Sequence, residues 1–413
     1  MNLNKYIFEL LIEVRKEYSI QPELNDEIAM NIIKDKIFTM TFVSKLSLEE
    51  IDLIINTVFY KTRRRLGILQ PLIDDPNISE IMVNGPDNVF IEKGGKLIRH
   101  NVCFENVKEL EDVMQNIAGD VHREINELNP IVDCRLMDGS RVNGVYKNVA
   151  VNGPILTIRK FSESFLTMKD LISNGTINEE GAKLLEYLVI SGYNIFVSGG
   201  TSTGKTTFLN ALAYSIPKNE RVIVIEDSME LKLTSVENIV HMESKKGNQN
   251  GVGKVTMSDL IKSSLRMRPD RIIVGEIRGD EVIPMLQAMN TGHNGSLSTG
   301  HANSVSGMLK RIETMYLSSM PISLDAIRLQ IAEGIDIMVH LERLSSGKRV
   351  VSDISEIVSY ENNEFVINNL MKYENSELKR TDNKIISTRK VILKGKEVTN
   401  ELRKDGFIVW WKV

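Results

Sequence analysis

The chain has 413 residues, of which 42% are hydrophobic and 26% are charged, and its formal net charge is −4. This composition is typical of a globular protein with two or three domains, and it gives no global electrostatic reason to expect nucleic acid as a partner. The two cysteines, Cys103 and Cys134, form no CxxC pair, so neither a disulfide framework nor a zinc site is indicated. No apolar stretch approaches the length of about eighteen residues that a membrane span needs, and the N-terminus lacks a signal-peptide pattern. We therefore expect a cytoplasmic protein that reaches a membrane only through a partner.

The first 65 residues show the spacing of amphipathic helices. Apolar positions recur at helical intervals in 6–14 and again in 28–38, and Ser47-Leu-Glu-Glu50 is a capping-box pattern that opens a third segment. We predict a small helical bundle over 1–65. It carries no catalytic constellation, so its expected role is structural or partner-docking.

An α+β domain is predicted over 66–162, because short strands separated by turn signals replace the helical pattern. One helix is expected over Val107–Ala118. The expected strands are Ile78–Val83, Val89–Glu92, Lys96–Arg99, Cys134–Met137, Ser140–Asn143 and Ile155–Arg159. Residues 163–177 are interpreted as a linker.

From residue 178 onward strands and helices alternate, as they do in parallel α/β folds. The expected strands are Asn194–Ser198, Arg221–Glu226, Ile239–Met242, Arg271–Val274, Ser296–Thr299 and Asp336–Leu341, with further strands in 350–365. We assign 178–360 to this α/β domain and 361–413 to a C-terminal extension to which the sequence gives no role.

A phosphate-binding loop is predicted between Gly199 and Thr206, where the chain reads GGTSTGKT between an apolar run and a helical segment. Glycines let successive backbone N–H groups converge on phosphates, and the new helix adds the positive end of its dipole. Lys205 is expected to reach the β- and γ-phosphates, and Thr206 to offer its hydroxyl to Mg²⁺. The chain is therefore predicted to bind a nucleoside triphosphate through Gly200, Thr201, Ser202, Thr203, Gly204, Lys205, Thr206 and Thr207.

Two apolar strands end in carboxylates. Glu276 ends the run Ile272-Ile-Val-Gly-Glu276, a position from which an acid orients Mg²⁺ or the attacking water. Glu226 ends the other run and is followed closely by Asp227 and Glu230. Because the carboxyl ends of parallel strands face one crevice, these acids are candidates for metal coordination or for polarising water. The alternatives are a strand that simply ends in a charged residue and, for Asp227, a cap.

Histidines and arginines supply further candidates. His293 and His301 bracket one expected strand, and since a zinc site would need more ligands, we expect them to sense the γ-phosphate by hydrogen bonding. Arg135, Arg141 and Arg159 lie on strands of the preceding domain, and transition-state charge is often stabilised by a guanidinium from another domain or subunit. The alternative for these arginines is an ordinary solvated surface.

Four motifs occur in the order GGTSTGKT, VIVIEDSMEL, RPDRIIVGEIRG and TGHNGSLSTGHANS. They resemble the Walker A motif, Asp box, Walker B motif and His box of the secretion and pilus-assembly ATPases of type II and type IV systems. Through IMVNGPDNVFIEKGGKL, CRLMDGSRVN and LTIRKF the chain is most similar to the CpaF/TadA subfamily, the motors of tight-adherence pili. The resemblance covers roughly 65–360. Its small departures, Asn294, Cys134, Met137 and His122, lie outside the residues to which a role is assigned.

The resemblance implies a RecA-like ATPase domain preceded by an α+β, PAS-like N-domain and a helical bundle, assembled as a homohexamer. ATP with Mg²⁺ would bind between the domains, with Thr206 and Glu276 at the metal and Glu226 or Glu230 activating water. His293 and His301 would report the phosphate state, and the three N-domain arginines would neutralise charge. The implied partners are a polytopic inner-membrane platform protein and, indirectly, pilin subunits, at the inner face of the cell membrane.

Three rival functions remain open from the sequence. One is the motor of a conjugation or effector-secretion apparatus, which keeps the chemistry and changes the cargo. Another is a DNA or RNA translocase, against which the acidic balance and the lack of an aromatic and basic tract speak. The third is an ATP-gated scaffold with negligible hydrolysis, against which the intact acids speak.

Overall fold

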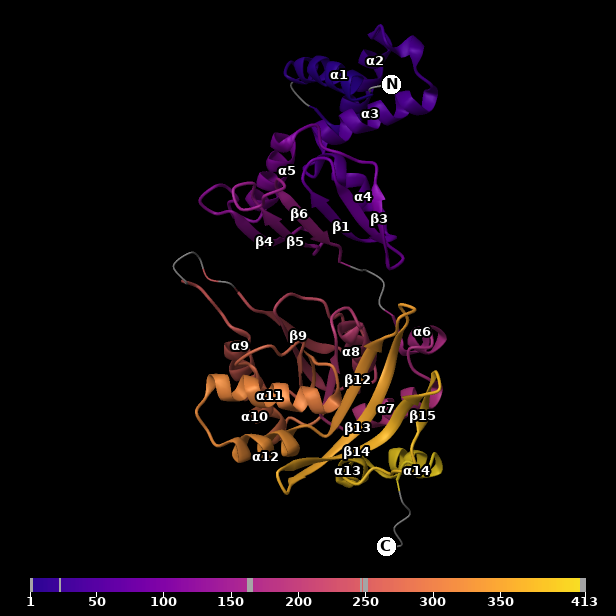
Figure 1. Cartoon of the computed structure of the whole chain (residues 1–413), viewed down its shortest axis with the longest axis vertical. Coiled ribbons are helices and arrows are strands. Elements are labelled where there is room, and N and C mark those ends of the chain that lie inside the picture. Colours follow the sequence, from indigo (N-terminus) through magenta and orange to yellow (C-terminus); the bar gives the residue numbers. More distant parts are fainter. Residues whose placement is uncertain (1–2, 22–23, 162–165, 246, 248–251, 409–413) are drawn as a thin grey trace. The chain divides into compact units, whose positions relative to one another are not determined.

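The computed structural model describes residues 3–21, 24–161, 166–245, 247 and 252–408 (Figure 1). The chain divides into two compact units, residues 1–163 and 164–413, and each is described by itself.

The first unit begins with the predicted three-helix bundle, formed by α1 (Leu3–Tyr18), α2 (Asp26–Thr39) and α3 (Leu48–Arg63). The apolar faces of the three helices form one core that includes Leu10, Ile33 and Ile54. The predicted capping box is confirmed, since the Ser47 hydroxyl accepts from the Glu50 amide and the Glu50 carboxylate accepts from the Ser47 amide at 2.8 Å. Two single-turn 3₁₀ segments, Val43–Lys45 and Gly67–Leu69, and α4 (Gln70–Asp74) complete the helical part.

A six-stranded antiparallel sheet follows, in the order β3-β2-β1-β6-β5-β4. Its strands are β1 (Ile78–Asn84), β2 (Val89–Lys93), β3 (Lys96–His100), β4 (Ile131–Arg135), β5 (Arg141–Val145) and β6 (Ile155–Arg159). Helix α5 (Val107–Asp120) contributes Leu110 and Met114 to the same core as the sheet.

Six expected strands are thus present, with one shift. The prediction placed a strand over 134–137, whereas β4 ends at Arg135. The strand ends early because the tight turn begins at Leu136, directly after Arg135. The Leu136 amide donates to the Ser140 carbonyl, and the Asp138 carboxylate accepts from the Ser140 amide at 2.9 Å.

The second unit is built on a nine-stranded sheet in the order β15-β14-β13-β12-β7-β11-β10-β8-β9. Its strands are β7 (Ile195–Gly199), β8 (Arg221–Glu226), β9 (Asn238–Glu243), β10 (Arg271–Val274), β11 (Leu297–His301), β12 (Ile337–Arg343), β13 (Arg349–Glu361), β14 (Glu364–Glu374) and β15 (Glu377–Arg380). The six strands β12, β7, β11, β10, β8 and β9 are parallel, whereas β13, β14 and β15 extend the sheet antiparallel. The six strands predicted individually in this region are found within two residues of their expected bounds, whereas the further strands expected in 350–365 continue to Glu374.

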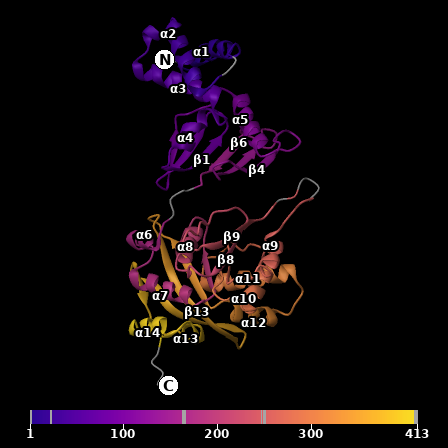
Figure 2. The same cartoon turned by 180° about the vertical axis from the view of Figure 1, so that it is seen from behind.

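Helices cover both faces of this sheet, so its central strands are buried on both sides (Figures 1 and 2). Ile195 and Val197 of β7 face one core and Phe196 faces the other, which is why the strand is a continuous apolar run rather than an alternating one. One face is covered by α6 (Met168–Ser173), α7 (Glu179–Ile190), α8 (Lys205–Ala213), α13 (Arg389–Lys394) and α14 (Lys396–Lys404). The other is covered by α9 (Met257–Ser264), α10 (Val282–Asn290), α11 (Val305–Ser319) and α12 (Leu324–Gly334).

The segment 384–390 is fixed to the amino edge of the parallel strands by buried polar groups. Glu356, fully buried, accepts hydrogen bonds from the Asn368 side chain at 2.8 Å and from the amides of Ile386 and Ser387 at 2.9 and 2.7 Å. Lys390 pairs with Asp336 at 2.6 Å. No role was predicted for this segment from the sequence, and in the structure Ile385 belongs to the core of the second unit.

Candidate functional site

The loop 199–204 joins β7 to α8 and has the backbone that a phosphate cradle needs. Ser202 and Gly204 lie in the left-handed region, at φ of 59° and 89°, and α8 begins at Lys205. Gly199 admits no side chain, since a Cβ there would be 2.6 Å from the Leu341 carbonyl oxygen and from the Thr203 hydroxyl. All eight predicted nucleotide-binding residues, 200–207, therefore lie on this loop and the first turn of the helix.

Lys205 is buried beside the loop. Its Nζ donates to the Gly200 carbonyl oxygen at 2.9 Å and lies 3.2 Å from Nδ1 of His301. Burial lowers the pKa of Lys205, and the nearby Glu276 carboxylate opposes that effect. The ammonium group is thus held in place by a backbone carbonyl and an imidazole, both of which a phosphate group can replace.

Glu276 follows β10 at the same edge of the sheet. Arg278 donates to its Oε2 at 2.6 Å, and Nε2 of His301 lies 2.8 Å from its Oε1. Burial alone would raise the pKa of Glu276, but the hydrogen bond and charge of Arg278, with the charges of His301 and Lys205, outweigh it and lower the pKa. The structure therefore brings Lys205, His301 and Glu276 together as one connected group.

His301, the last residue of β11, links the other two. Burial lowers the pKa of His301, and the nearby Glu276 carboxylate opposes that effect. The tautomer with hydrogen on Nε2 fits both neighbours, because Nδ1 then accepts from the Lys205 ammonium and Nε2–H faces the Glu276 carboxylate.

Glu226 has a different environment from Glu276. It is buried at the end of β8, and its Oε1 accepts hydrogen bonds from the amides of Glu230 and Leu231 at 3.0 and 3.1 Å. The carboxylate thus orders the turn that follows β8, and Glu230 lies half-buried in that turn.

Arg278 is a residue that the sequence analysis did not single out. Its hydrogen bond to Glu276, together with the charges of two acids of the turn after β8, raises its pKa. Those acids are Asp227 and Glu230. The signal for it was present, since a basic residue follows the predicted acid by two positions.

His293 is not brought to the loop. It lies in the turn before β11, where its Nδ1 is 3.3 Å from the Ala288 carbonyl oxygen. The amides of Gly295 and Ser296, next along that turn, donate to Asn194, which precedes β7. His293 therefore lies at the amino edge of the sheet, opposite the edge at which His301 meets Lys205.

The three predicted arginines form a row in the first unit. Arg135 on β4 is directly opposite Arg141 on β5, which is opposite Arg159 on β6. Directly opposed side chains share a face of the sheet, and like charges so placed are unfavourable without an anion. Glu80 on β1 continues the row beside Arg159. The structure thus brings the three predicted arginines together on one face of this sheet.

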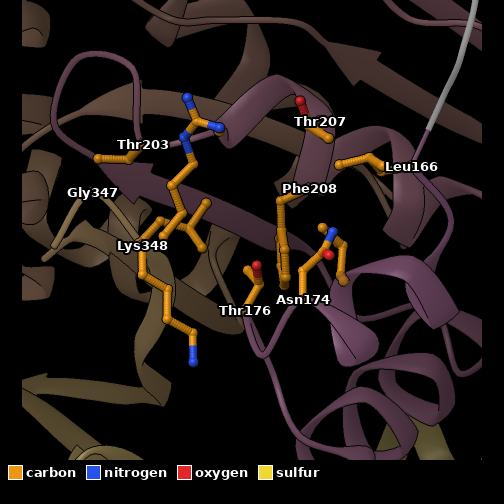
Figure 3. Close-up of a pocket in the computed structure, with 12 residues that line it drawn as sticks. Leu166, Asn174, Thr176, Thr203, Thr207, Phe208, Gly347 and Lys348 are labelled. Atoms are coloured by element: carbon orange, nitrogen blue, oxygen red, sulfur yellow. The ribbon is translucent and has the colours of Figure 1, made fainter. Parts of the chain in front are cut away.

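A pocket of about 270 Å³ lies beside the phosphate loop (Figure 3). Thr203, Gly204 and Thr207 form one part of its lining, and Lys348 of the turn before β13 and Arg349, the first residue of β13, form another. In Figure 3 the Phe208 ring lies at its centre, between Lys348 on one side and Asn174 on the other. The pocket thus continues the phosphate loop with a partly apolar cavity.

Among the described residues, no three side chains of His, Cys, Asp or Glu are grouped so that they alone would hold a metal ion. In the same part of the chain, no helix combines the length and the apolar character that crossing a bilayer requires.

The family model of the type II/IV secretion system proteins matches residues 62–403. The conjugal transfer protein TrbB of Rhizobium radiobacter is 32% identical over 300 residues, which cover 71% of this chain and 88% of that protein. An uncharacterised protein of Methanocaldococcus jannaschii is 41% identical over 254 residues, 58% of this chain, but the alignment spans only 34% of the archaeal protein.

Among solved structures, the crystal structure of the pilus retraction motor PilT with bound ADP superimposes with a TM-score of 0.53 at 19% identity, over 82% of this chain and 87% of that one. At this identity the likeness concerns the fold. It agrees with the predicted α/β fold class, an N-terminal domain followed by a RecA-like domain, which is confirmed.

Proposed function

This chain belongs to the type II/IV secretion system protein family, and we propose that it is an ATP-hydrolysing motor of a membrane-associated secretion or pilus apparatus. The observation that supports this function most strongly is the connected group Lys205, His301 and Glu276 at the end of a complete phosphate loop.

In the proposed reaction, Lys205 exchanges its bond to the Gly200 carbonyl for the β- and γ-phosphates of ATP. Glu276 orients the attacking water, with Glu230 or Glu226 as the residue that polarises it. His301 is hydrogen-bonded to both Lys205 and Glu276 and so reports the phosphate state. The arginine row Arg135, Arg141 and Arg159 supplies positive charge to the transferring phosphoryl group.

Magnesium fits the residues at this site. The Glu276 carboxylate lies against His301, which in turn contacts Lys205, the residue next to Thr206, and carboxylate and hydroxyl oxygens are the ligands that Mg²⁺ prefers. Thr206 and Glu276 would hold the ion, which supplies charge neutralisation on the phosphates.

Within this family we propose the narrower role of a tight-adherence pilus motor. It rests on the similarity of the motifs in 81–161 to the CpaF/TadA subfamily. It implies a homohexamer acting on a polytopic membrane platform at the inner face of the membrane. A second candidate is the motor of a conjugation or effector-secretion apparatus, which the names of the relatives favour.

The chemistry is tested with Glu276→Gln. This variant should bind a fluorescent ATP analogue as the wild type does, yet release phosphate at least about a hundredfold more slowly, because it loses the charge that orients water. Glu237→Gln, an exposed glutamate before β9, is the control. Wild-type turnover by Glu276→Gln would contradict the assignment.

The cargo is tested by cross-linking Glu276→Gln in its native cells and identifying captured proteins by mass spectrometry. A polytopic platform protein with small pilin-like proteins supports the pilus motor. A DNA coupling protein or a relaxase supports the second candidate instead.

A further inference from the structure

The hairpin of β12 and β13 extends past the end of β7. Strand β12 pairs with β7 in parallel, with Leu341 opposite Gly199, where β7 gives way to the phosphate loop. Strand β12 continues for two more residues, and its Arg343 pairs with Arg349 of β13. The end of the hairpin therefore lies alongside the loop.

Arg349 makes two contacts with that loop. Its Nε donates to the Ser202 carbonyl oxygen at 3.0 Å. Its Cδ is 3.4 Å from the position that a Cβ on Gly204 would occupy. The aliphatic part of the Arg349 side chain thus packs against the bend at Gly204, while its guanidinium binds the bend at Ser202.

The backbone at these bends needs support. Ser202 has a φ of 59°, which is unfavourable for a residue with a side chain, and such conformations persist where the surroundings fix them. Thr203 of the loop and Lys205, the first residue of α8, donate to the Gly200 carbonyl. Among the described residues, Arg349 is the one side chain from a distant part of the sequence that hydrogen-bonds to the loop backbone.

This arrangement separates two tasks. In the proposed reaction Lys205 leaves the Gly200 carbonyl when phosphate enters, so it ceases to hold the loop at that moment. Arg349 binds a different carbonyl, that of Ser202, and this hydrogen bond can persist when phosphate enters.

We propose that Arg349 is a positioning residue of the phosphate loop, and that it acts through the Ser202 carbonyl to keep the loop amides in the phosphate-binding arrangement. The inference rests on the proposed nucleotide binding. It implies that Arg349 contributes to nucleotide affinity and little to the chemical step.

The test is Arg349→Met, which keeps an apolar stem against Gly204 and removes the donor to Ser202. A fluorescent ATP analogue with Mg²⁺ should bind this variant about tenfold more weakly, the size expected for loss of one charge-assisted hydrogen bond. KM for ATP should rise in parallel, while kcat at saturating ATP stays within about twofold of the wild type.

Two variants complete the design. Arg349→Lys keeps a cationic donor for the single carbonyl, so it should recover most of the lost affinity. Arg343→Ala removes the same charge from the paired position of the same hairpin and should bind within about twofold of the wild type.

Wild-type affinity in Arg349→Met, or a fall in kcat at unchanged affinity, would overturn the inference. Failure of Arg349→Lys to recover would also overturn it, because the fork of the guanidinium would then be needed for the ligand itself. If the wild-type chain binds no nucleotide, the proposed function is wrong, an outcome that is distinct because it is seen before any variant is compared.

Discussion

The two edges of the nine-stranded sheet use the same kinds of charged residue in opposite ways. At the carboxyl edge, Lys205 and Glu276 have partners that a ligand can replace: a loop carbonyl, an imidazole and an exposed arginine. At the amino edge, Glu356 and Asp336 are bound to amides and a lysine of the segment 384–390 and are shielded from solvent. A charged group near a sheet therefore indicates a site only where its partners are replaceable. Where they are permanent, it holds the fold together.

Replacing the lysine of the loop should have the largest effect. Lys205→Ala removes the cation aimed at the phosphates, so nucleotide binding should be lost and phosphate release should fall at least about a thousandfold. Thermal unfolding without nucleotide should change little, because the hydrogen bonds that Lys205 makes among the described residues are to the Gly200 carbonyl and to His301. Retained binding of an ATP analogue would contradict the assignment of the carboxyl edge as the ligand-binding edge of the sheet.

At the amino edge the expected loss is one of stability. Glu356→Ala leaves two amides and one side-chain amide without their acceptor, and we expect the free energy of unfolding to fall by about 3 kcal/mol. Denaturant unfolding measures this change, and KM for ATP of the folded variant should stay near the wild-type value. A normal stability with a raised KM would reverse the assignment of the two edges.

The two histidines on either side of β11, His301 at its end and His293 in the turn before it, offer a sharper contrast. His301→Ala should slow turnover by about tenfold to a hundredfold, because it breaks the link between Lys205 and Glu276. His293→Ala, at the amino edge, should cost clearly less in the same phosphate-release assay. Equal losses would show that the histidine pair acts together, as the sequence motif first suggested.

The smallest effect concerns the pH dependence. Arg278 helps to keep the pKa of Glu276 below its usual value, so Arg278→Ala should raise that pKa. Since the ionised carboxylate is the active form in the proposed reaction, the acid limb of kcat/KM should move to higher pH, with activity at alkaline pH less affected. An acid limb that moves to lower pH, or not at all, would exclude this role for Arg278.

The sequence predicted what is local. The phosphate loop, the acid after β10 and the strand bounds of the second unit follow from short motifs and apolar runs. His293 could also have been placed, because it precedes the apolar strand at whose other end His301 lies, and a strand of five residues spans roughly 16 Å.

Other features depend on contacts between distant residues. Arg349 and Ser202 are 147 positions apart, and only the pairing of β12 with β7 brings them together. The choice between Glu226 and Glu230 as the acid that activates water could not be made from the sequence either. The hydrogen bonds that the Glu226 carboxylate accepts from the amides of Glu230 and Leu231 are contacts that no motif indicates.

The internal partner of Lys205 has a consequence for the timing of a motor. A buried ammonium without a partner would make departure of the product costly, and the site would stay filled. Here the Gly200 carbonyl lies 2.9 Å away and receives the ammonium as soon as the phosphates leave. The vacant state is thereby stabilised at the expense of tight retention of ADP, a property that suits a machine that must empty its sites in order to move.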